Sequence, residues 1–193
     1  EFREKDKLKE ILITEQGGLC AYTGRGIDKR FPNVSSIEHL KPQSDCREEL
    51  EAAGKAYGQD VGEDLNYHNM VATLRVSGAK REQYGEVCRG DRELKVLPTQ
   101  QGCGGRFRFL ADGNIEGKGS DANQVIKVLK LDHPALVELR RGVHKGVMWE
   151  ELSEGDLRAE IAHCESANGS LTEFCFVLAD FAQQELRLRG LSL

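Results

Sequence analysis

The sequence predicts an α+β fold that is mostly helical. Apolar residues recur at helical spacing in residues 5–15 and through most of the last third of the chain. Strand character is confined to residues 31–40 and 106–116, and in the second of these Asp112-Gly113 is a hairpin turn signal. With 193 residues, we expect one domain, or one domain with a helical annex, that buries a sizeable core.

In the first half of the chain, Gly17-Gly18 should end the N-terminal helix. After the strand at residues 31–40, we expect a helix at residues 44–56 and a polar loop at residues 58–63. Residues 67–74 contain Asn69 and an apolar run, and we expect them to begin another helix.

In the second half, the hairpin should be followed by a helix capped at Ser120 or Asp121. A second helix should run from Pro134 to about residue 152, and a third should follow a cap at Asp156. The capping box at residues 170–173 should open the last helix.

The formal net charge of −5 argues against a free nucleic-acid binder, which is usually basic. The acid is concentrated, however, because residues 45–64 hold seven acidic and two basic side chains. Residues 75–95 hold six basic and four acidic side chains. A weakly basic groove beside an acidic lobe is therefore compatible with the sequence, and most affinity for a nucleic acid would then come from a partner.

The six cysteines show no CxxC pair and no dense spacing of the kind found in small secreted proteins. No secretory signal and no apolar run of about 18 residues is visible. We therefore expect reduced thiols, a cytoplasmic protein and no membrane association. Cys164 and Cys175 fall on apolar faces of predicted helices, where we expect them to be packing residues.

One stretch, residues 35–44, carries the main chemical signal, because a carboxylate is followed directly by a histidine in Glu38-His39. A cysteine-bearing turn precedes it at residues 18–27, and Asn69 follows it. The motifs stand in this order: Cys20-Ala21-Tyr22-Thr23 with Ile27, then Ile37-Glu38-His39-Leu40-Lys41-Pro42-Gln43-Ser44, then Tyr67-His68-Asn69-Met70, Cys88-Arg89-Gly90 and Leu97-Pro98-Thr99.

This series resembles the HNH endonucleases, and most closely the HNH subunits of Septu-type and retron-associated anti-phage systems, the PtuB family. The resemblance covers residues 17–148. It implies a ββα-metal (HNH) core in residues 1–100, with an N-terminal helix and an acidic insertion at about residues 44–64. Residues 101–193 would form the β-hairpin and C-terminal helical region and pack with the core as one unit.

By this resemblance, His39 is the general base, Glu38 and Asn69 are catalytic and bind the metal, and Asp91 is a further metal ligand, with His68 as the second choice for that last position. A neutral histidine suits activation of water, and oxygen ligands suit Mg²⁺ or Mn²⁺. Alternatively, Asn69 could only cap a helix, and Glu38 could orient other groups without binding metal.

The family also carries a structural zinc knuckle, to which Cys20 and Cys88 would contribute thiolates. Thr23 and Thr73 stand where further cysteines are expected. A hydroxyl is a poor zinc ligand, so the zinc assignment is doubtful and a metal-free knuckle held by packing is the alternative.

The resemblance implies a metal-dependent endonuclease that acts on DNA or on an RNA such as tRNA. It would be the effector of a bacterial anti-phage complex with an ABC/SMC-like ATPase (PtuA-type), and in retron systems with a reverse transcriptase and its msDNA. The alternative is a catalytically eroded HNH-like module that only binds the ATPase.

Overall fold

The structure is a computed structural model that describes residues 2–28, 34–56, 62–165 and 169–192. In these ranges it is an α+β fold, mostly helical, with two antiparallel strand pairs, β1–β2 and β3–β4. The elements are α1 (Phe2–Glu15), β1 (Ser35–His39), α2 (Gln43–Ala52), β2 (Met70–Leu74), α3 (Glu86–Arg89), β3 (Phe107–Phe109), β4 (Ile115–Gly117), α4 (Ser120–Leu129), α5 (Pro134–Lys145), α6 (Glu154–Glu165) and α7 (Cys175–Leu188).

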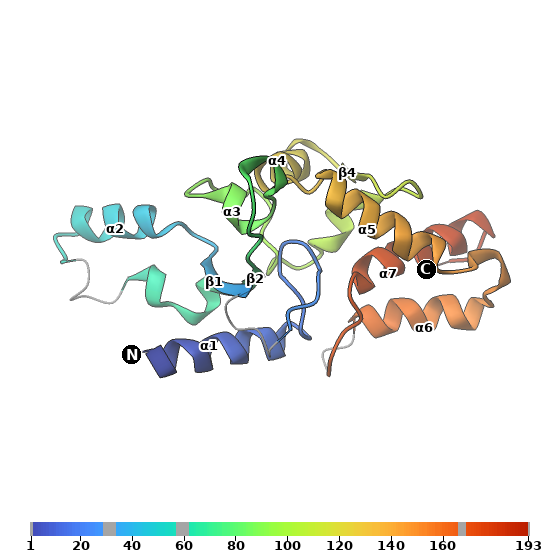
Figure 1. Cartoon of the computed structure of the whole chain (residues 1–193), viewed down its shortest axis with the longest axis horizontal. Helices are drawn as coiled ribbons and strands as arrows, with labels where there is room; N and C mark the ends of the chain where they lie inside the picture. The colour runs from blue at the N-terminus through green and yellow to red at the C-terminus, as the bar shows by residue number, and fades with distance from the viewer. Residues whose placement is uncertain (1, 29–33, 57–61, 166–168, 193) are drawn as a thin grey trace.

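The β1–β2 pair lies in the middle of an elongated molecule (Figure 1). Helix α1 packs against β2, and α2 lies at the same end as the N-terminus. At the other end, α6 and α7 pack against each other, and α7 also contacts β3 and α5. In the described part of the chain, no helix combines the length and the apolar character needed to cross a bilayer.

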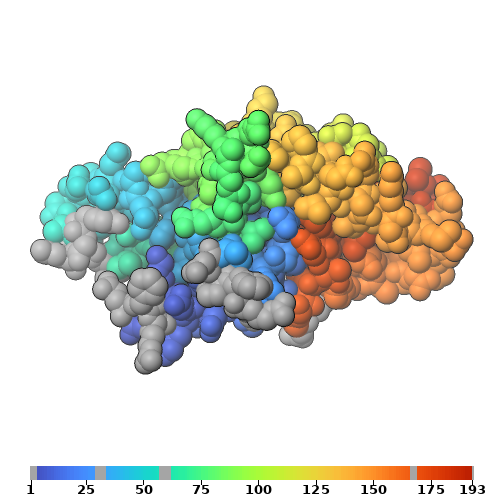
Figure 2. Space-filling view, in the orientation of Figure 1, coloured from blue at the N-terminus to red at the C-terminus, as the bar shows by residue number. Residues whose placement is uncertain are grey.

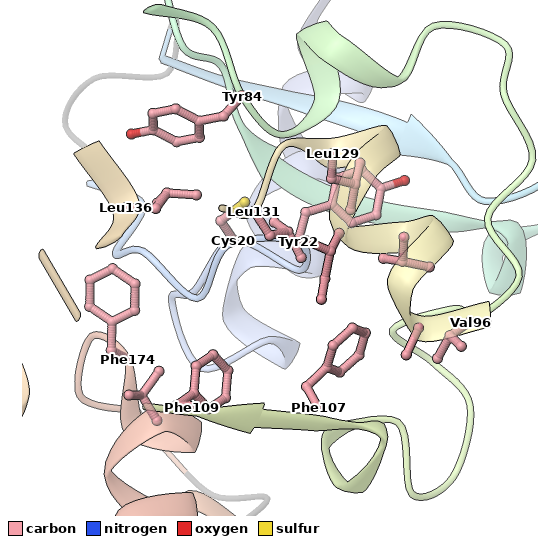
Figure 3. Packing of buried hydrophobic residues seen from close by; sticks show 14 of the residues in the cluster. Cys20, Tyr22, Tyr84, Val96, Phe107, Phe109, Leu129, Leu131, Leu136 and Phe174 are labelled. Carbon is pink, nitrogen blue, oxygen red and sulfur yellow. The ribbon is translucent and has the colours of Figure 1, made fainter. Parts of the chain in front are cut away.

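One cluster of buried side chains connects these elements. It runs from Leu12 in α1 to Leu186 in α7, so it draws on residues from both sides of residue 100. Its central part is formed by β3, the turn at residues 20–23 and the end of α4 (Figure 3). Burial of this apolar surface is the main force that holds the two halves together.

The prediction of a helix at residues 67–74 is wrong. Residues Tyr67–Asn69 form a 3₁₀ turn, and Met70–Leu74 is strand β2, which pairs antiparallel with β1. A five-residue apolar run cannot by periodicity alone be assigned to a helix or a strand. The pairing with β1 decides it, and Gln16 and Ala21 add hydrogen bonds to the Ala72 backbone.

The N-terminal helix, the helix after β1 and the hairpin are confirmed, with small shifts of their ends. The expected polar loop at residues 58–63 lies mostly outside the described residues. Helix α5 is shorter than predicted, because it ends at Lys145. The indole Nε1 of Trp149 then donates to the His144 carbonyl, and Trp149 also contacts Phe181 in α7, so the chain turns where the helix was expected to continue.

The last helix begins at Cys175 and not at the predicted capping box. Phe174 has a left-handed backbone (φ 60°), and its N–H donates to the Gly24 carbonyl. The Leu171 N–H likewise donates to the Gly17 carbonyl, so residues 171–174 are fastened to the N-terminal turn before α7 starts. Cys175 is buried and its thiol contacts that of half-buried Cys164 at 3.3 Å, which agrees with a packing role for both.

Leu136 and Leu139 on α5 provide a matched test of this core. Leu136 is fully buried, whereas Leu139 is 40% exposed. We expect Leu136→Ala to lower the free energy of unfolding by about 2–5 kcal/mol, because it leaves a cavity. Leu139→Ala should cost less than about 0.5 kcal/mol. Urea unfolding followed by circular dichroism measures both, and equal effects would contradict the assigned burial.

Candidate active site

Glu38 and His39 are the last two residues of β1, where the strand leaves the β1–β2 pair. They lie opposite Val71 and Met70 of β2. Successive side chains of a strand point to opposite faces, so the two groups leave the backbone in different directions and meet different neighbours. The sequence neighbours Glu38 and His39 therefore have separate electrostatic surroundings.

The imidazole of His39 is half-buried beside Asp64, a buried residue of the 3₁₀ turn Glu63–Leu65. Burial lowers the pKa of His39, and a hydrogen bond to the Asp64 backbone together with the Asp64 charge opposes this only in part. The ring is therefore neutral at pH 7. A backbone hydrogen bond that fixes one ring nitrogen leaves the other to accept a proton, as a general base requires.

Asn69 is buried and fastens the chain just after His39. Its Oδ1 accepts from the Lys41 N–H at 2.7 Å, and its Nδ2 donates to the Glu63 carbonyl at 3.1 Å. Its own carbonyl accepts from the Leu40 N–H. The helix-cap alternative does not hold, since Asn69 ends a 3₁₀ turn that is capped by Asn66. The Asn69 amide thus positions the loop that follows His39.

Arg89, at the end of α3, was not a candidate in the sequence, yet it is the most enclosed polar group near Glu38, with a side chain only 1% exposed. Its guanidinium donates to the Tyr22 hydroxyl and to the carbonyls of His39 and Leu40, and Nη1 lies 3.5 Å from Glu38 Oε2. The only sequence signal was its place in the Cys88-Arg89-Gly90 motif, because a lone arginine in a short segment does not reveal burial.

The carboxyl group of Glu38 has a pKa far above its ordinary value. Burial raises its pKa to about 7, and although Arg89 opposes this shift, the charges of Glu86 and Asp91 add to it. Glu86 Oε1 is buried without a hydrogen-bond partner among the described residues, and its nearest cation is Arg75 Nε at 3.5 Å. Two further carboxylates, one in α3 and one just after it, thus disfavour the ionised form of Glu38.

These groups can be tested against the divalent metal that the resemblance implies. Carboxylate oxygens are the donors Mg²⁺ prefers, and this ion is often held by one or two carboxylates while it keeps several waters. Within the described ranges, no group of three or more His, Cys, Asp or Glu side chains could enclose a metal ion. A largely hydrated ion at Glu38 would need few protein donors, and the charges of exposed Asp91 and of Glu86, which pairs with Arg75, act on the same carboxyl.

The remaining residues predicted as metal ligands make other contacts. His68 is exposed and contacts the Tyr67 ring, so it does not join Glu38. The Cys20 thiol accepts from the Leu74 N–H at 3.1 Å, and the Cys88 thiol donates to the Gln83 carbonyl at 3.2 Å.

The two threonines of the knuckle are both buried. Thr73 Oγ1 lies 3.1 Å from the Ser36 hydroxyl, and Thr23 Oγ1 accepts weakly from the Arg25 N–H. Each position at which the family would place a zinc ligand therefore makes its own contact within the protein. The knuckle turn is held in this structure by hydrogen bonds and packing.

Acidic and basic segments occupy different parts of the surface. The acidic α2 region lies at one end of the face in Figure 2, and the segment at about residues 75–83, drawn in green, projects near the middle. Arg75 and Arg81 of that segment have side chains 63% and 87% exposed.

No protein-family model matches the chain, and no curated protein matches its sequence.

Arg89 gives a stability test of this site. We expect Arg89→Met to lower the free energy of unfolding by about 3–5 kcal/mol, because Tyr22, His39 and Leu40 lose a shared donor and Glu38 loses its buried partner. Arg81→Met, at an exposed position, should change it by less than about 0.5 kcal/mol. Urea unfolding at pH 8 checks both, and a small effect at Arg89 would contradict the network.

Proposed function

We propose that this chain is a metal-dependent HNH-type endonuclease. The observation that supports this most is His39, a neutral, half-buried imidazole at the end of a strand, oriented by the Asp64 backbone and followed by a loop that Asn69 holds in place. Carboxylates on the neighbouring surface have the donor chemistry for a hard cation. A general base and a hydrated divalent cation are the two groups that hydrolysis of a phosphodiester needs, and in this proposal both stand at the end of β1.

In this proposal, His39 accepts the proton of the attacking water. Glu38 holds the divalent ion, with Asp91 or Glu86 as a further oxygen donor. Bound there, the ion supplies Lewis-acid stabilisation of the developing negative charge and of the leaving oxygen. Arg89 acts as a positioning residue, because it binds the Glu38 carboxylate and the His39 carbonyl with one rigid guanidinium.

We further propose that the chain works within a complex. Its net charge of −5 leaves little attraction for a polyanion, and the exposed bases at residues 75–95 are few. The motif resemblance favours an ABC/SMC-like ATPase as the partner, in a Septu-type or retron-associated anti-phage system with DNA or tRNA as substrate. The partner would then supply most of the affinity for the substrate.

Replacement of the base tests the activity. We expect His39→Ala to lower cleavage by about 10²- to 10⁴-fold, the usual contribution of a general base. The assay follows plasmid DNA and total tRNA with Mg²⁺ or Mn²⁺, for the chain alone and for the complex with its co-purified partner. His68→Ala is the matched control, because this exposed histidine lies one residue from Asn69. Full activity of His39→Ala would refute the assignment.

Glu38 should set the pH dependence. Because its pKa is about 7, its ionised form increases as pH rises through 7, and we expect cleavage at limiting Mg²⁺ to rise over the same range. The lowered pKa of His39 places its own deprotonation below pH 6.5. A higher Mg²⁺ concentration should move the midpoint to lower pH, because the metal competes with the proton.

Glu38→Gln should abolish the Mg²⁺-dependent rise of the cleavage rate near pH 7 and leave only weak cleavage. Glu48→Gln, an exposed carboxyl of α2, should keep the wild-type profile. Rates measured between pH 5.5 and 8.5 at two Mg²⁺ concentrations distinguish the variants. A midpoint that ignores Mg²⁺ would exclude Glu38 as a ligand.

The second candidate is a non-catalytic module that binds the ATPase. The observation that favours it is that the protein's own groups already bind the candidate site residues. Arg89 pairs with Glu38, and the Asn69 amide makes its hydrogen bonds to backbone groups. If neither the chain alone nor its complex cleaves DNA or tRNA above a metal-independent background, and if His39→Ala still forms a stable complex, the binding module is supported over the nuclease.

A further inference from the structure

An apolar cavity of about 240 Å³ lies apart from the His39 site, between the residue 21–24 turn, the β3–β4 hairpin and α4. Figure 3 shows Phe107 and Phe109 pointing away from β3 toward Tyr22, Leu129 and Leu131, which line the same space. Other apolar lining residues come from residues 94–98, from α4 and from α7, namely Leu94, Val96, Pro98, Val125 and Phe176.

This cavity is only partly enclosed, so it is a pocket that a ligand could enter and not a sealed void of the interior. Its lining offers little to water, since cavities lined by Leu, Ile and Phe stay dry and take up apolar molecules. Half-buried Cys103 and exposed Gly104 also line it, so a small molecule can approach from the surface at this segment.

One charged group borders this apolar space. Arg140 of α5 is 3% exposed, and its Nε and Nη2 donate to the carbonyls of Gly113 and Leu131. These acceptors are neutral, and within the described ranges no carboxylate lies within ion-pair distance of Arg140, although the charge of Asp132 acts on it. Burial lowers the pKa of Arg140 to about 10, which agrees with a guanidinium removed from water.

We propose that this cavity binds a small apolar ligand that carries one carboxylate. The apolar lining would bury the body of the ligand. The carboxylate would pair with the buried guanidinium of Arg140 and accept charge-assisted hydrogen bonds from it. A cavity of about 150 Å³ takes benzene, so this one takes about ten non-hydrogen atoms, the size of a medium-chain fatty acid or a phenylalkanoic acid. A phosphate ester fits less well, because its extra charge would meet a single cation and apolar walls.

Octanoate, octan-1-ol and octylamine form a probe series of equal length and different charge. Isothermal titration calorimetry on the wild-type chain should show one octanoate per chain. Octan-1-ol should bind about tenfold to a hundredfold more weakly, the range expected for loss of a charge-assisted hydrogen bond, and octylamine weaker still. Equal affinity for octanoate and octylamine, or no saturable binding of octanoate, would overturn the proposal.

Three variants locate the site. Arg140→Met should reduce octanoate affinity to that of octan-1-ol or below it, because the carboxylate loses its only cation, whereas Arg141→Met, at the neighbouring residue that pairs with Glu138, should leave the affinity unchanged. Val125→Phe fills the cavity from α4 and should abolish binding of both probes. Octanoate bound equally by Val125→Phe would place the ligand elsewhere. If Arg140→Met fails to fold, the wild-type probe series and Val125→Phe still decide.

Discussion

The buried guanidinium of Arg89 is the interaction on which the centre of this molecule depends. It joins α3 to the end of β1 through the carbonyls of His39 and Leu40, and it reaches the N-terminal turn through the Tyr22 hydroxyl. The five N–H groups of a guanidinium are held in one rigid plane, so a single side chain can serve several separate acceptors with little loss of conformational freedom. Because burial of an unpaired charge is costly, the surrounding chain is constrained to keep these acceptors in place.

This constraint also sets the chemistry of the strand end. Burial and the charges of Glu86 and Asp91 raise the pKa of Glu38, and Arg89 opposes this by stabilising the ionised form. The carboxyl can therefore ionise near neutral pH. Tyr22 extends the connection, because its hydroxyl binds Arg89 while its ring lines the apolar cavity. The cavity and the His39 strand end are thus joined through two side chains.

Many local features were predicted, although α5 ends earlier and α7 begins later than expected, and features that depend on distant partners were missed. The hairpin at Asp112-Gly113 and helix α4 follow from turn chemistry and apolar spacing within a few residues. Strand β2 was taken for a helix because its pairing partner lies far away in the sequence, with Ser36 placed 37 residues before Thr73, and no short window shows this pairing. Glu38 and His39 stood out as a motif, but their different surroundings did not.

The sequence by itself determined the fold class, the order of most elements and the strand that ends in Glu38-His39, because each depends on neighbours along the chain. Only the tertiary structure decided that Arg89 is buried, that the Asn69 amide holds the loop after His39, and that Arg140 borders an apolar cavity. Burial, pKa shifts and cavities arise from groups far apart in sequence, so they exist only once the chain has folded.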